Sequence, residues 1–442
     1  MNKKIVYFFI FFINSICILC KNPQGVVGSS PKESFDLAME YYVAGEHKKA
    51  FELFSKLLWA FPDNCYVSCM RIKTMKACGY LDQAIASYEK FIALYPDYKM
   101  AYKDLGFCYL LKGDFKAGYA THCKIGIDGF RGVNKEKIGS EPYDWHADIA
   151  GKTILIIDEN GYGDFFQWIR FAKVIKKKGA KVVVKARKEL LPLLSHCPYI
   201  DVLISQGEKY DDSDFSIYSG EFFRLFQVDE ATIPADVPYL YADELLVEKW
   251  SRVLSQDKNF KVGICWEPKA YMCRYNKTFL KQGRAAPLLA FYQLSKLKNV
   301  SLYSLQKING LEQICSIPKD FNLYFFKGDF DNKNGRFSDT AAVMKNLDLV
   351  ITIDTSIAHL AGALGVPVWV LLPKMPDWRW FLDRSDSPWY PTMRLFRKPI
   401  FPKKYKHSEF FLKSGMSDWE SVMNEIKENL EKVVQNFKRD NT

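Results

Sequence analysis

The sequence is poor in the residues that mark fibrous or low-complexity proteins, and its cysteines lack the spacing of a metal site. Glycine (25) and proline (19) are too few in 442 residues for a collagen-like or low-complexity chain. No CxxC pair occurs among the nine cysteines beyond residue 20, and this odd number within apolar patterns indicates free core thiols rather than a disulfide framework. No recognition-helix, zinc-finger or RNP-like pattern is present, so nucleic acid is not an expected partner.

Length and composition instead indicate a globular protein of several domains. At about 100–200 residues per domain, 442 residues predict two to four units. Hydrophobic residues (48%) and charged residues (26%) are close to the globular average, and the formal net charge of +11 indicates an anionic partner. Nine Lys and Arg residues lie between Arg170 and Lys188 without an acid, which is typical of a solvated helix end or of a landing site for a phosphorylated substrate.

The first 20 residues form an apolar leader. Lys3 and Lys4 precede an apolar run over 5–20, which is the form of a secretory signal peptide. The run is short for the ~20 residues of a membrane-spanning helix, and no clear small-x-small cleavage site follows it. Residues 1–20 therefore predict a signal peptide or a membrane anchor, and a protein that is exported or membrane-associated, with the cytoplasmic face left open.

Residues 31–130 repeat with a period of 34. Glycines, small residues and prolines recur at this spacing: Gly45, Gly79 and Gly113; Ala50, Ala84 and Gly118; Pro62 and Pro96. A glycine between two helices and a proline that closes each unit are typical of tetratricopeptide repeats, of which three make a stable array. We expect the small residues to let paired helices approach closely, and the array to offer a surface to a protein partner.

Short apolar strands alternate with helical patterns after residue 150, which predicts parallel sheets covered by helices. The first series, 150–255, has predicted strands at 152–158, 181–185, 202–205 and 215–217. The second series, 260–442, has predicted strands at 262–266, 301–305, 347–353 and 366–372, and helices at 287–298, 339–346, 356–364 and 419–437. Two such α/β halves place a ligand in the cleft outside the carboxyl ends of their strands.

The best candidate site begins at Asp354, directly after the apolar strand LDLVITI. Asp354, Thr355 and Ser356 open a helix of small residues, and free backbone N–H groups with two hydroxyls suit a diphosphate. The alternative is that Asp354 and Thr355 only cap the helix. His359, one turn inside, is predicted to meet a phosphate or ribose, or else to be a packing histidine.

A second candidate is the loop Gly161-Tyr162-Gly163-Asp164 at the mouth of the first half. The glycines allow the backbone to approach a ligand, and Asp164 is placed to deprotonate an acceptor hydroxyl as a general base. The alternative is that Asp164 is an N-cap residue.

Cations and acids near the predicted cleft complete the set of candidates. Lys307 and Arg284, and with lower priority Arg274, follow strands of the second half and are predicted to neutralise the leaving phosphate of a donor. The acidic cluster at 211–214 mimics a DxD metal site, but no other oxygen ligands accompany it, so no metal site is predicted.

Three segments together resemble a known family. DTSIAHLAGALGVPVWVLLPKMPDWRWFLDRSDSPWYPTMRLFR, from Asp354 to Arg397, closely resembles the C-terminal signature of tetratricopeptide-repeat proteins with a glycosyltransferase family 9 domain, the heptosyltransferase-like group. GKTILIIDENGYGDFFQWIRFAKVIKKKGAKVVV is similar to the family's N-terminal segment, and VGICW with SLYSLQK to its middle. The likeness covers residues 33–400.

The resemblance implies a GT-B fold and inverting, metal-independent transfer of a sugar from a nucleotide-diphosphate donor, with no cofactor. The acceptor would be a glycan, a lipid-linked glycan or a protein presented by the repeats. Asp164 matches the proposed catalytic base, and four residues match the donor-phosphate loop: Asp354, Thr355, Ser356 and His359. Lys307 and Arg284 are assigned to the donor as well, and five residues to the cleft: Gly161, Gly163, Trp266, Asp377 and Trp378. The DWRW and SPWYP elements, which also contain Arg379, Trp389 and Tyr390, are expected to shape the C-terminal wall of the cleft.

One departure and one alternative accompany this interpretation. The loop after VGICW, EPKAYMCRYNKTFLKQGRAAP, is bulkier and more basic than the family's, which leaves the identity of the donor open. The alternative is a non-catalytic binding or scaffold protein, in which the repeats recognise a partner and the transferase domain is degenerate. The retained Asp164 and the intact DTSIAHLAG loop argue for the enzyme.

Overall fold

The computed structural model describes six stretches of the chain: 30–125, 148–159, 161–272, 279–280, 283–398 and 417–440. The predictions for residues 1–20 and for Arg274 lie outside these stretches and stay predictions. Within them, no helix combines the length and the apolar character that crossing a membrane requires.

The N-terminal part is an array of three helix pairs, as the 34-residue period predicts. The helices are α2 (Pro31–Ala44), α3 (His47–Ala60), α4 (Cys65–Ala77), α5 (Leu81–Leu94), α6 (Lys99–Lys112) and α7 (Phe115–Cys123). Gly45, Gly79 and Gly113 each lie between the two helices of a pair with φ of 86°, 98° and 87°. This left-handed conformation is one that glycine adopts without strain, which explains why glycine recurs there.

The small residues of the repeats lie where the helices touch. Ala50 and Ala84 are fully buried. At Gly118 of α7 a Cβ atom would lie 2.6 Å from Cδ2 of Leu110 on α6, which is too close for any side chain. The expectation that these positions allow close helix pairing is therefore confirmed.

The first α/β half contains a parallel sheet with the strand order β3-β2-β1-β4. Its strands are β1 (Thr153–Ile157), β2 (Lys181–Ala186), β3 (Val202–Ser205) and β4 (Phe215–Tyr218). Its helical segments are α8 (Tyr162–Trp168), α9 (Arg170–Lys177), η3 (Lys188–Leu190), α10 (Leu191–Leu194), η4 (Ser219–Glu221) and α11 (Phe222–Phe226). The central strands are apolar on both faces because helices cover the sheet.

The second half contains a six-stranded parallel sheet with the order β12-β11-β10-β5-β8-β9. Its strands are β5 (Phe260–Cys265), β8 (Val300–Ser304), β9 (Leu323–Tyr324), β10 (Leu349–Ile353), β11 (Val368–Leu372) and β12 (Met393–Arg397). Its helical segments are η5 (Leu288–Lys296), η6 (Leu311–Ser316), α13 (Ser338–Met344), α14 (Ser356–Ala363), η7 (Trp378–Trp380) and α16 (Ser417–Asp440). Two parallel Rossmann-like halves behind a helical array are the GT-B arrangement that the sequence predicts.

Several segments differ from the sequence-based expectations. The predicted α-helix at 287–298 is a 3-10 helix, η5, in which Leu288, Phe291 and Leu294 are fully buried. Their spacing of three places them on one face at 3.0 residues per turn, so this winding buries all three. The connecting helix α12 (Glu244–Leu254), which was not predicted, packs on α13, where Trp250 donates to Asp339 over 2.8 Å.

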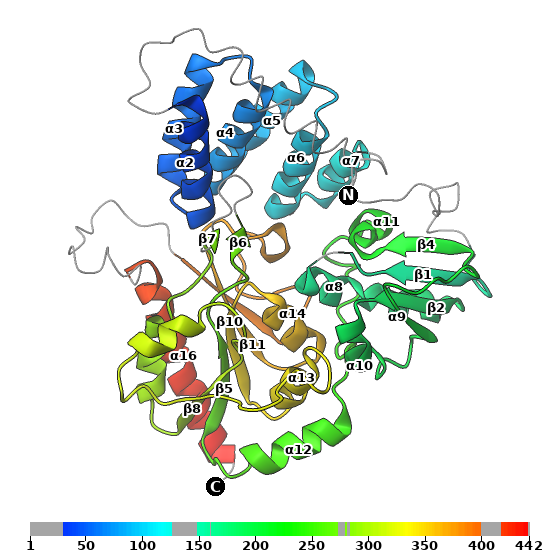
Figure 1. Ribbon diagram of the computed structural model, residues 1–442, viewed down its shortest axis with the longest axis vertical. Coiled ribbons are helices and arrows are strands. Elements are labelled where there is room, and N and C mark those ends of the chain that lie inside the picture. Colours follow the sequence, from blue (N-terminus) through cyan, green and yellow to red (C-terminus); the bar gives the residue numbers. More distant parts are fainter. Residues whose placement is uncertain are drawn as a thin grey trace.

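The repeat array contacts both α/β halves (Figure 1). On the first half, the Tyr119 hydroxyl donates to the carbonyl of Val228 over 2.6 Å. On the second half, the backbone N–H of Gly283 donates to the carbonyl of Val43 over 3.0 Å. Gly283 follows the short hairpin of β6 (Tyr271–Met272) and β7 (Phe279–Leu280), which lies in the bulky loop after VGICW and points at the array in Figure 1. The array therefore bridges the two halves.

Candidate active site

The two candidate loops meet at the boundary between the halves. Helix α8, which follows the glycine loop, packs against α14, which follows β10 (Figure 1). At Gly163 a Cβ atom would lie 2.8 Å from Cδ2 of His359 and 3.4 Å from Cα of Ser356. The glycine that the sequence assigns to ligand approach therefore lets the two helices touch.

The start of α14 carries the predicted donor loop. Thr355 is the N-cap residue, and its hydroxyl accepts from the backbone N–H of Ile357 over 3.3 Å. Asp354 is buried and pairs with Arg284, whose Nη1 lies 3.2 Å from Oδ2. Burial raises the pKa of the Asp354 carboxyl, and the Arg284 guanidinium counteracts this in part. Of the two predicted caps, only Thr355 acts as one, and the structure brings Arg284 into contact with the donor loop.

His359 is a buried residue inside α14. Its Nδ1 lies 2.8 Å from the hydroxyl of Tyr390, and its ring centroid is 5.3 Å from that of Trp380. Burial lowers the pKa of His359 well below 6.5, and the nearby Arg379 charge lowers it further. The imidazole is therefore neutral near pH 7, and its packing on Gly163 supports the contact between the halves.

Asp164 lies in the first turn of α8, and Gly161 is the N-cap residue. The alternative that Asp164 caps the helix is wrong, because its carboxylate is turned to the other half. Oδ1 accepts from Nη2 of Arg379 over 2.6 Å, and 40% of the side chain is exposed. A half-exposed carboxylate at the end of a sheet has the access that a general base needs.

The guanidinium of Arg379, in η7, donates hydrogen bonds to three side chains. Besides Asp164, its Nη1 donates to Asp377 over 2.9 Å, and its Nε donates to Oε1 of Gln167. Asp377 also caps η7 by accepting from the backbone N–H of Arg379 over 3.1 Å. The predicted cleft residue Asp377 is thus connected to Asp164 through the Arg379 guanidinium, although 213 positions separate the two acids (164 to 377).

Within the described stretches, Lys307 forms no hydrogen bond or ion pair with the donor loop. Among the described residues, its ammonium is held by the carbonyl of Phe330 and by Oδ1 of Asn332, the latter at 3.1 Å. Burial lowers the pKa of Lys307. The assignment of this lysine to the donor stays a prediction that needs a movement of its side chain.

The two tryptophans assigned to the cleft are buried. Trp266 is a core residue of the second half, fully buried, with its indole N–H donating to the carbonyl of Gly310 over 3.1 Å. Its placement in the cleft is therefore wrong, because no surface remains for a ligand. Trp378 is 4% exposed and lies between the halves and the repeats, where it stacks on Trp168 and on Phe107 of α6.

Sequence reasoning missed the role of Arg170, which begins the basic stretch. Its guanidinium is buried and donates to the carbonyl of Trp389 over 2.7 Å and to the hydroxyl of Tyr239 over 2.9 Å. It connects the first half to the second instead of lying on a solvated face. Gln167, fully buried, was missed as well. No local signal reveals either residue, because their partners lie far away in the sequence.

Two acidic residues near the sheet of the first half, Glu159 and Asp214, lie in different environments. Glu159 follows β1, and burial together with the nearby Glu221 carboxylate raises its pKa to about 7. Asp214 belongs to the acidic cluster at 211–214, for which no metal role is predicted. Its carboxylate accepts from the backbone N–H of Thr153 over 2.8 Å and pairs with Lys152. Among the described residues, no three His, Cys, Asp or Glu side chains are grouped to hold a metal ion.

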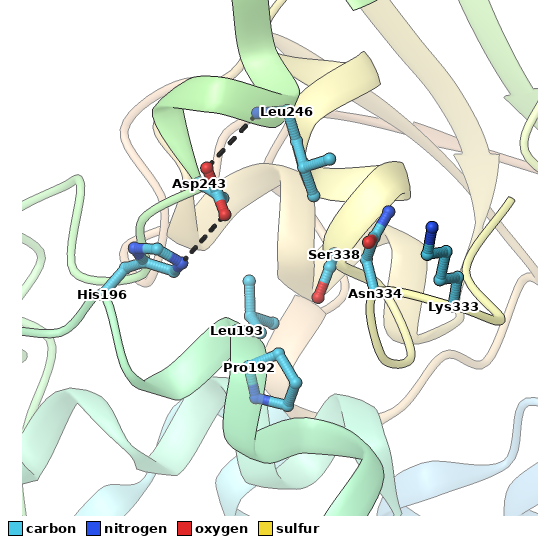
Figure 2. A pocket seen from close by; sticks show the side chains of 8 residues that line it. All are labelled: Pro192, Leu193, His196, Asp243, Leu246, Lys333, Asn334 and Ser338. Atoms are coloured by element: carbon cyan, nitrogen blue, oxygen red, sulfur yellow. Dashed lines mark hydrogen bonds and ion pairs between the residues drawn. The ribbon is translucent and has the colours of Figure 1, made fainter. Parts of the chain in front are cut away.

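A cavity of about 280 Å³ lies where the two halves meet α12 (Figure 2). In it, Nε2 of His196 lies 3.6 Å from Oδ2 of Asp243, whose other oxygen caps α12. The remaining lining residues are Pro192, Leu193, Leu246, Lys333, Asn334 and Ser338. Pockets that hold drug-sized ligands measure about 300–1,000 Å³, and the volume of this cavity lies just below that range.

Comparisons with known proteins give low identities and partial coverage. No family model matches the chain. Protein FlbA of Caulobacter vibrioides is 22% identical over 275 residues, which cover 56% of this chain and 44% of that protein. The chain thus spans less than half the length of this curated relative.

Solved structures with a similar arrangement fall into two groups. A glycosyltransferase of family 9 from Veillonella parvula DSM 2008 is 13% identical, with a TM-score of 0.43 over 63% of this chain and 99% of that one. The E. coli ADP-heptose heptosyltransferase II is 14% identical, with a TM-score of 0.41 over 62% and 99%. The tetratricopeptide-repeat domain of P58(IPK) is 22% identical, with a TM-score of 0.21 over 25% of this chain and 30% of that chain. The chain is similar to these proteins in the α/β halves and in the helical array respectively.

Proposed function

We propose that the protein is a glycosyltransferase that moves a sugar from a nucleotide-diphosphate donor to a hydroxyl acceptor. The observation that carries the proposal is the meeting of two chemically distinct loops at the boundary of the halves. One presents the half-exposed carboxylate of Asp164, and the other presents the start of α14 with Thr355, Ser356 and Arg284. Ligands of parallel α/β halves bind at this edge of the sheets.

The second half supplies the groups for a diphosphate. The N-terminus of an α-helix offers free backbone N–H groups and a partial positive charge to an anion. Thr355 and Ser356 add hydroxyls there, and Arg284 adds a cation that now pairs with Asp354. These groups stabilise the negative charge that grows on the departing phosphate. Lys307 would join them after a side-chain movement.

The first half supplies the base. In a single displacement, the acceptor oxygen forms a bond to the anomeric carbon as the bond from that carbon to the diphosphate oxygen breaks. The acceptor proton passes to Asp164, and the nucleotide diphosphate leaves with the bonding electron pair. Attack opposite to the leaving group inverts the anomeric centre, and no metal is needed where Arg284 and the helix end balance the charge.

Binding of the donor requires α8 to shift away from the start of α14. Gly163 lies against Ser356 and His359, so α8 now covers the end of α14 that would receive the phosphates. Closure of two domains over a substrate is a common way to exclude water before transfer.

We propose a glycan, a lipid-linked glycan or a protein presented by the repeats as the acceptor.

The test is detection of donor turnover by mass spectrometry across a panel of nucleotide sugars, with the wild type and Asp164→Asn. Replacement of a general base typically lowers kcat by ~10²–10⁴-fold, while the donor affinity measured by calorimetry stays the same. Wild-type turnover in Asp164→Asn contradicts the assignment of the base. Absence of turnover and of binding for every donor supports the alternative of a non-catalytic binding protein.

A further inference from the structure

Arg379 joins the second half to the candidate base of the first. Its guanidinium donates to Asp164, Asp377 and Gln167, and only 12% of its side chain is exposed. Burial works to lower the pKa of Arg379, but the carboxylates of Asp377 and Asp164 raise it, so it stays charged. Nε, Nη1 and Nη2 each donate to a different acceptor. This arrangement uses the fork of donors on a guanidinium, which a lysine does not reproduce.

This contact makes the two oxygens of the Asp164 carboxylate different from each other. Oδ1 accepts from Arg379 over 2.6 Å. Within the described part of the chain, Oδ2 has no hydrogen-bond partner, and the side chain is 40% exposed. One oxygen is therefore anchored, and the other is left to accept a proton.

Aromatic rings hold Arg379 in turn. The guanidinium carbon lies 5.6 Å from the ring centroid of Trp168 and 5.2 Å from that of Trp378. Trp378 stacks on Phe107, a residue of the repeat helix α6, with centroids 6.3 Å apart and planes inclined by 10°. A continuous set of contacts thus leads from the repeats through Trp378 and Arg379 to Asp164.

We propose that Arg379 is a positioning residue for Asp164, and that helix α6 of the repeat array holds Arg379 in place through Trp378. The proposal rests on the proposed function, because it assumes that Asp164 is the base. A base must lie about 2.6–3.2 Å from the proton it removes, and a misplacement of ~1 Å lowers the rate by ~100-fold. The repeats are then part of the active site as well as a surface for a partner.

The kinetic test compares Arg379→Ala and Arg379→Lys with the control Arg384→Ala. Arg384 also joins the halves, pairing with Glu230 over 2.6 Å, but it does not contact Asp164. We expect Arg379→Ala to lower kcat by ~100-fold with little change in donor KM, and added guanidinium ion to restore part of the rate. Arg379→Lys retains part of kcat, and Arg384→Ala behaves as the wild type. A wild-type kcat in Arg379→Ala overturns the proposal. So does a lower kcat that neither added guanidinium nor the Arg379→Lys substitution restores in part.

The contribution of the repeats is tested at Phe107. Phe107→Ala removes the ring that supports Trp378, whereas Phe107→Tyr keeps it. We expect a lower kcat in the first variant, an unchanged kcat in the second, and folded protein in both by thermal unfolding. An unchanged kcat in Phe107→Ala refutes the role of α6.

A readout independent of turnover separates this proposal from the proposed function. Hydrogen–deuterium exchange is measured over Tyr162–Trp168 in the wild type, Arg379→Ala and Phe107→Ala. We expect faster exchange in both variants, because α8 loses its anchor on the second half. If the wild type turns over no donor, the proposed function fails, but the exchange rates still test whether Arg379 and Phe107 hold α8 in place. Unchanged exchange in both variants overturns the present proposal.

Discussion

Replacing Gly163 by alanine should disturb the contact between the two halves. The added Cβ would lie 2.8 Å from Cδ2 of His359 and 3.4 Å from Cα of Ser356. Carbon atoms in contact normally lie about 3.5–4.0 Å apart, so the first distance is short by about 1 Å. The His359 ring is buried and bonded to the Tyr390 hydroxyl at 2.8 Å, and therefore cannot turn away freely. The two helices must move apart.

The clash sets the magnitude of this change. Overpacking of a tight contact costs about 1–3 kcal/mol. The gain of about 0.5–1 kcal/mol from alanine in place of glycine within a helix stabilises both arrangements equally, since α8 is folded in both, and does not offset this cost. The closed arrangement should therefore lose at least about 1 kcal/mol, a roughly fivefold or larger shift toward separated halves. One cluster of buried apolar residues runs through the repeats, the first half and one face of the second half's sheet, and a second cluster covers the other face of that sheet.

The assay is hydrogen–deuterium exchange over α8 and α14, with small-angle scattering to detect separation of the halves. Gly207→Ala is the matched control, because a Cβ there meets nothing within 4 Å. We expect faster exchange and a larger radius of gyration in Gly163→Ala, and wild-type values in Gly207→Ala. Equal exchange in both variants would refute the packing of Gly163 against His359 as a contact that holds the halves together.

Two further predictions concern pH and have opposite signs. The folded protein keeps His359 neutral well below pH 6.5, whereas the unfolded chain takes up a proton near 6.5, so stability should fall as the pH drops from about 7 to about 5. Urea unfolding at several pH values should show a smaller fall in His359→Gln, and an identical fall would contradict the burial argument. Glu159 keeps its proton up to about pH 7 in the folded state and only to about 4.5 when unfolded, so its contribution to stability is lost as the pH rises through this interval. Glu159→Gln should therefore be more stable than the wild type at pH 8 and equal to it at pH 4; equal stability at both would exclude the raised pKa.

Much of the fold could be predicted from the sequence because the signals are local. The three glycines spaced by 34 residues mark the turns of the repeats, since each needs a left-handed backbone. Buried strands such as 349–353 show as apolar runs, and the loops after them carry the polar residues. β12 was not predicted, because a short edge strand forms through its pairing with β11.

The candidate site could be predicted only in part. Asp164 and the loop from Asp354 to His359 were found because each follows an apolar strand and opens a helix. Arg284, the partner of Asp354, was predicted as a donor-binding cation. The bond between Arg379 and Asp164 was not predicted, since a contact between positions 164 and 379 leaves no mark in the residues around either one. Trp266 was assigned to the cleft for a similar reason. The sequence around a tryptophan at the end of a strand does not distinguish a cleft from a core, and the structure buries Trp266 in the core.

The sequence by itself determined the order of the units, the strands and the two polar loops, because backbone conformation and apolar periodicity depend on near neighbours. Only the tertiary structure decided that α8 and α14 touch, that Arg379 holds Asp164, and that the repeats support this pair through Trp378. These arrangements depend on the packing of segments that lie far apart in the chain, where shape and charge must fit together in three dimensions.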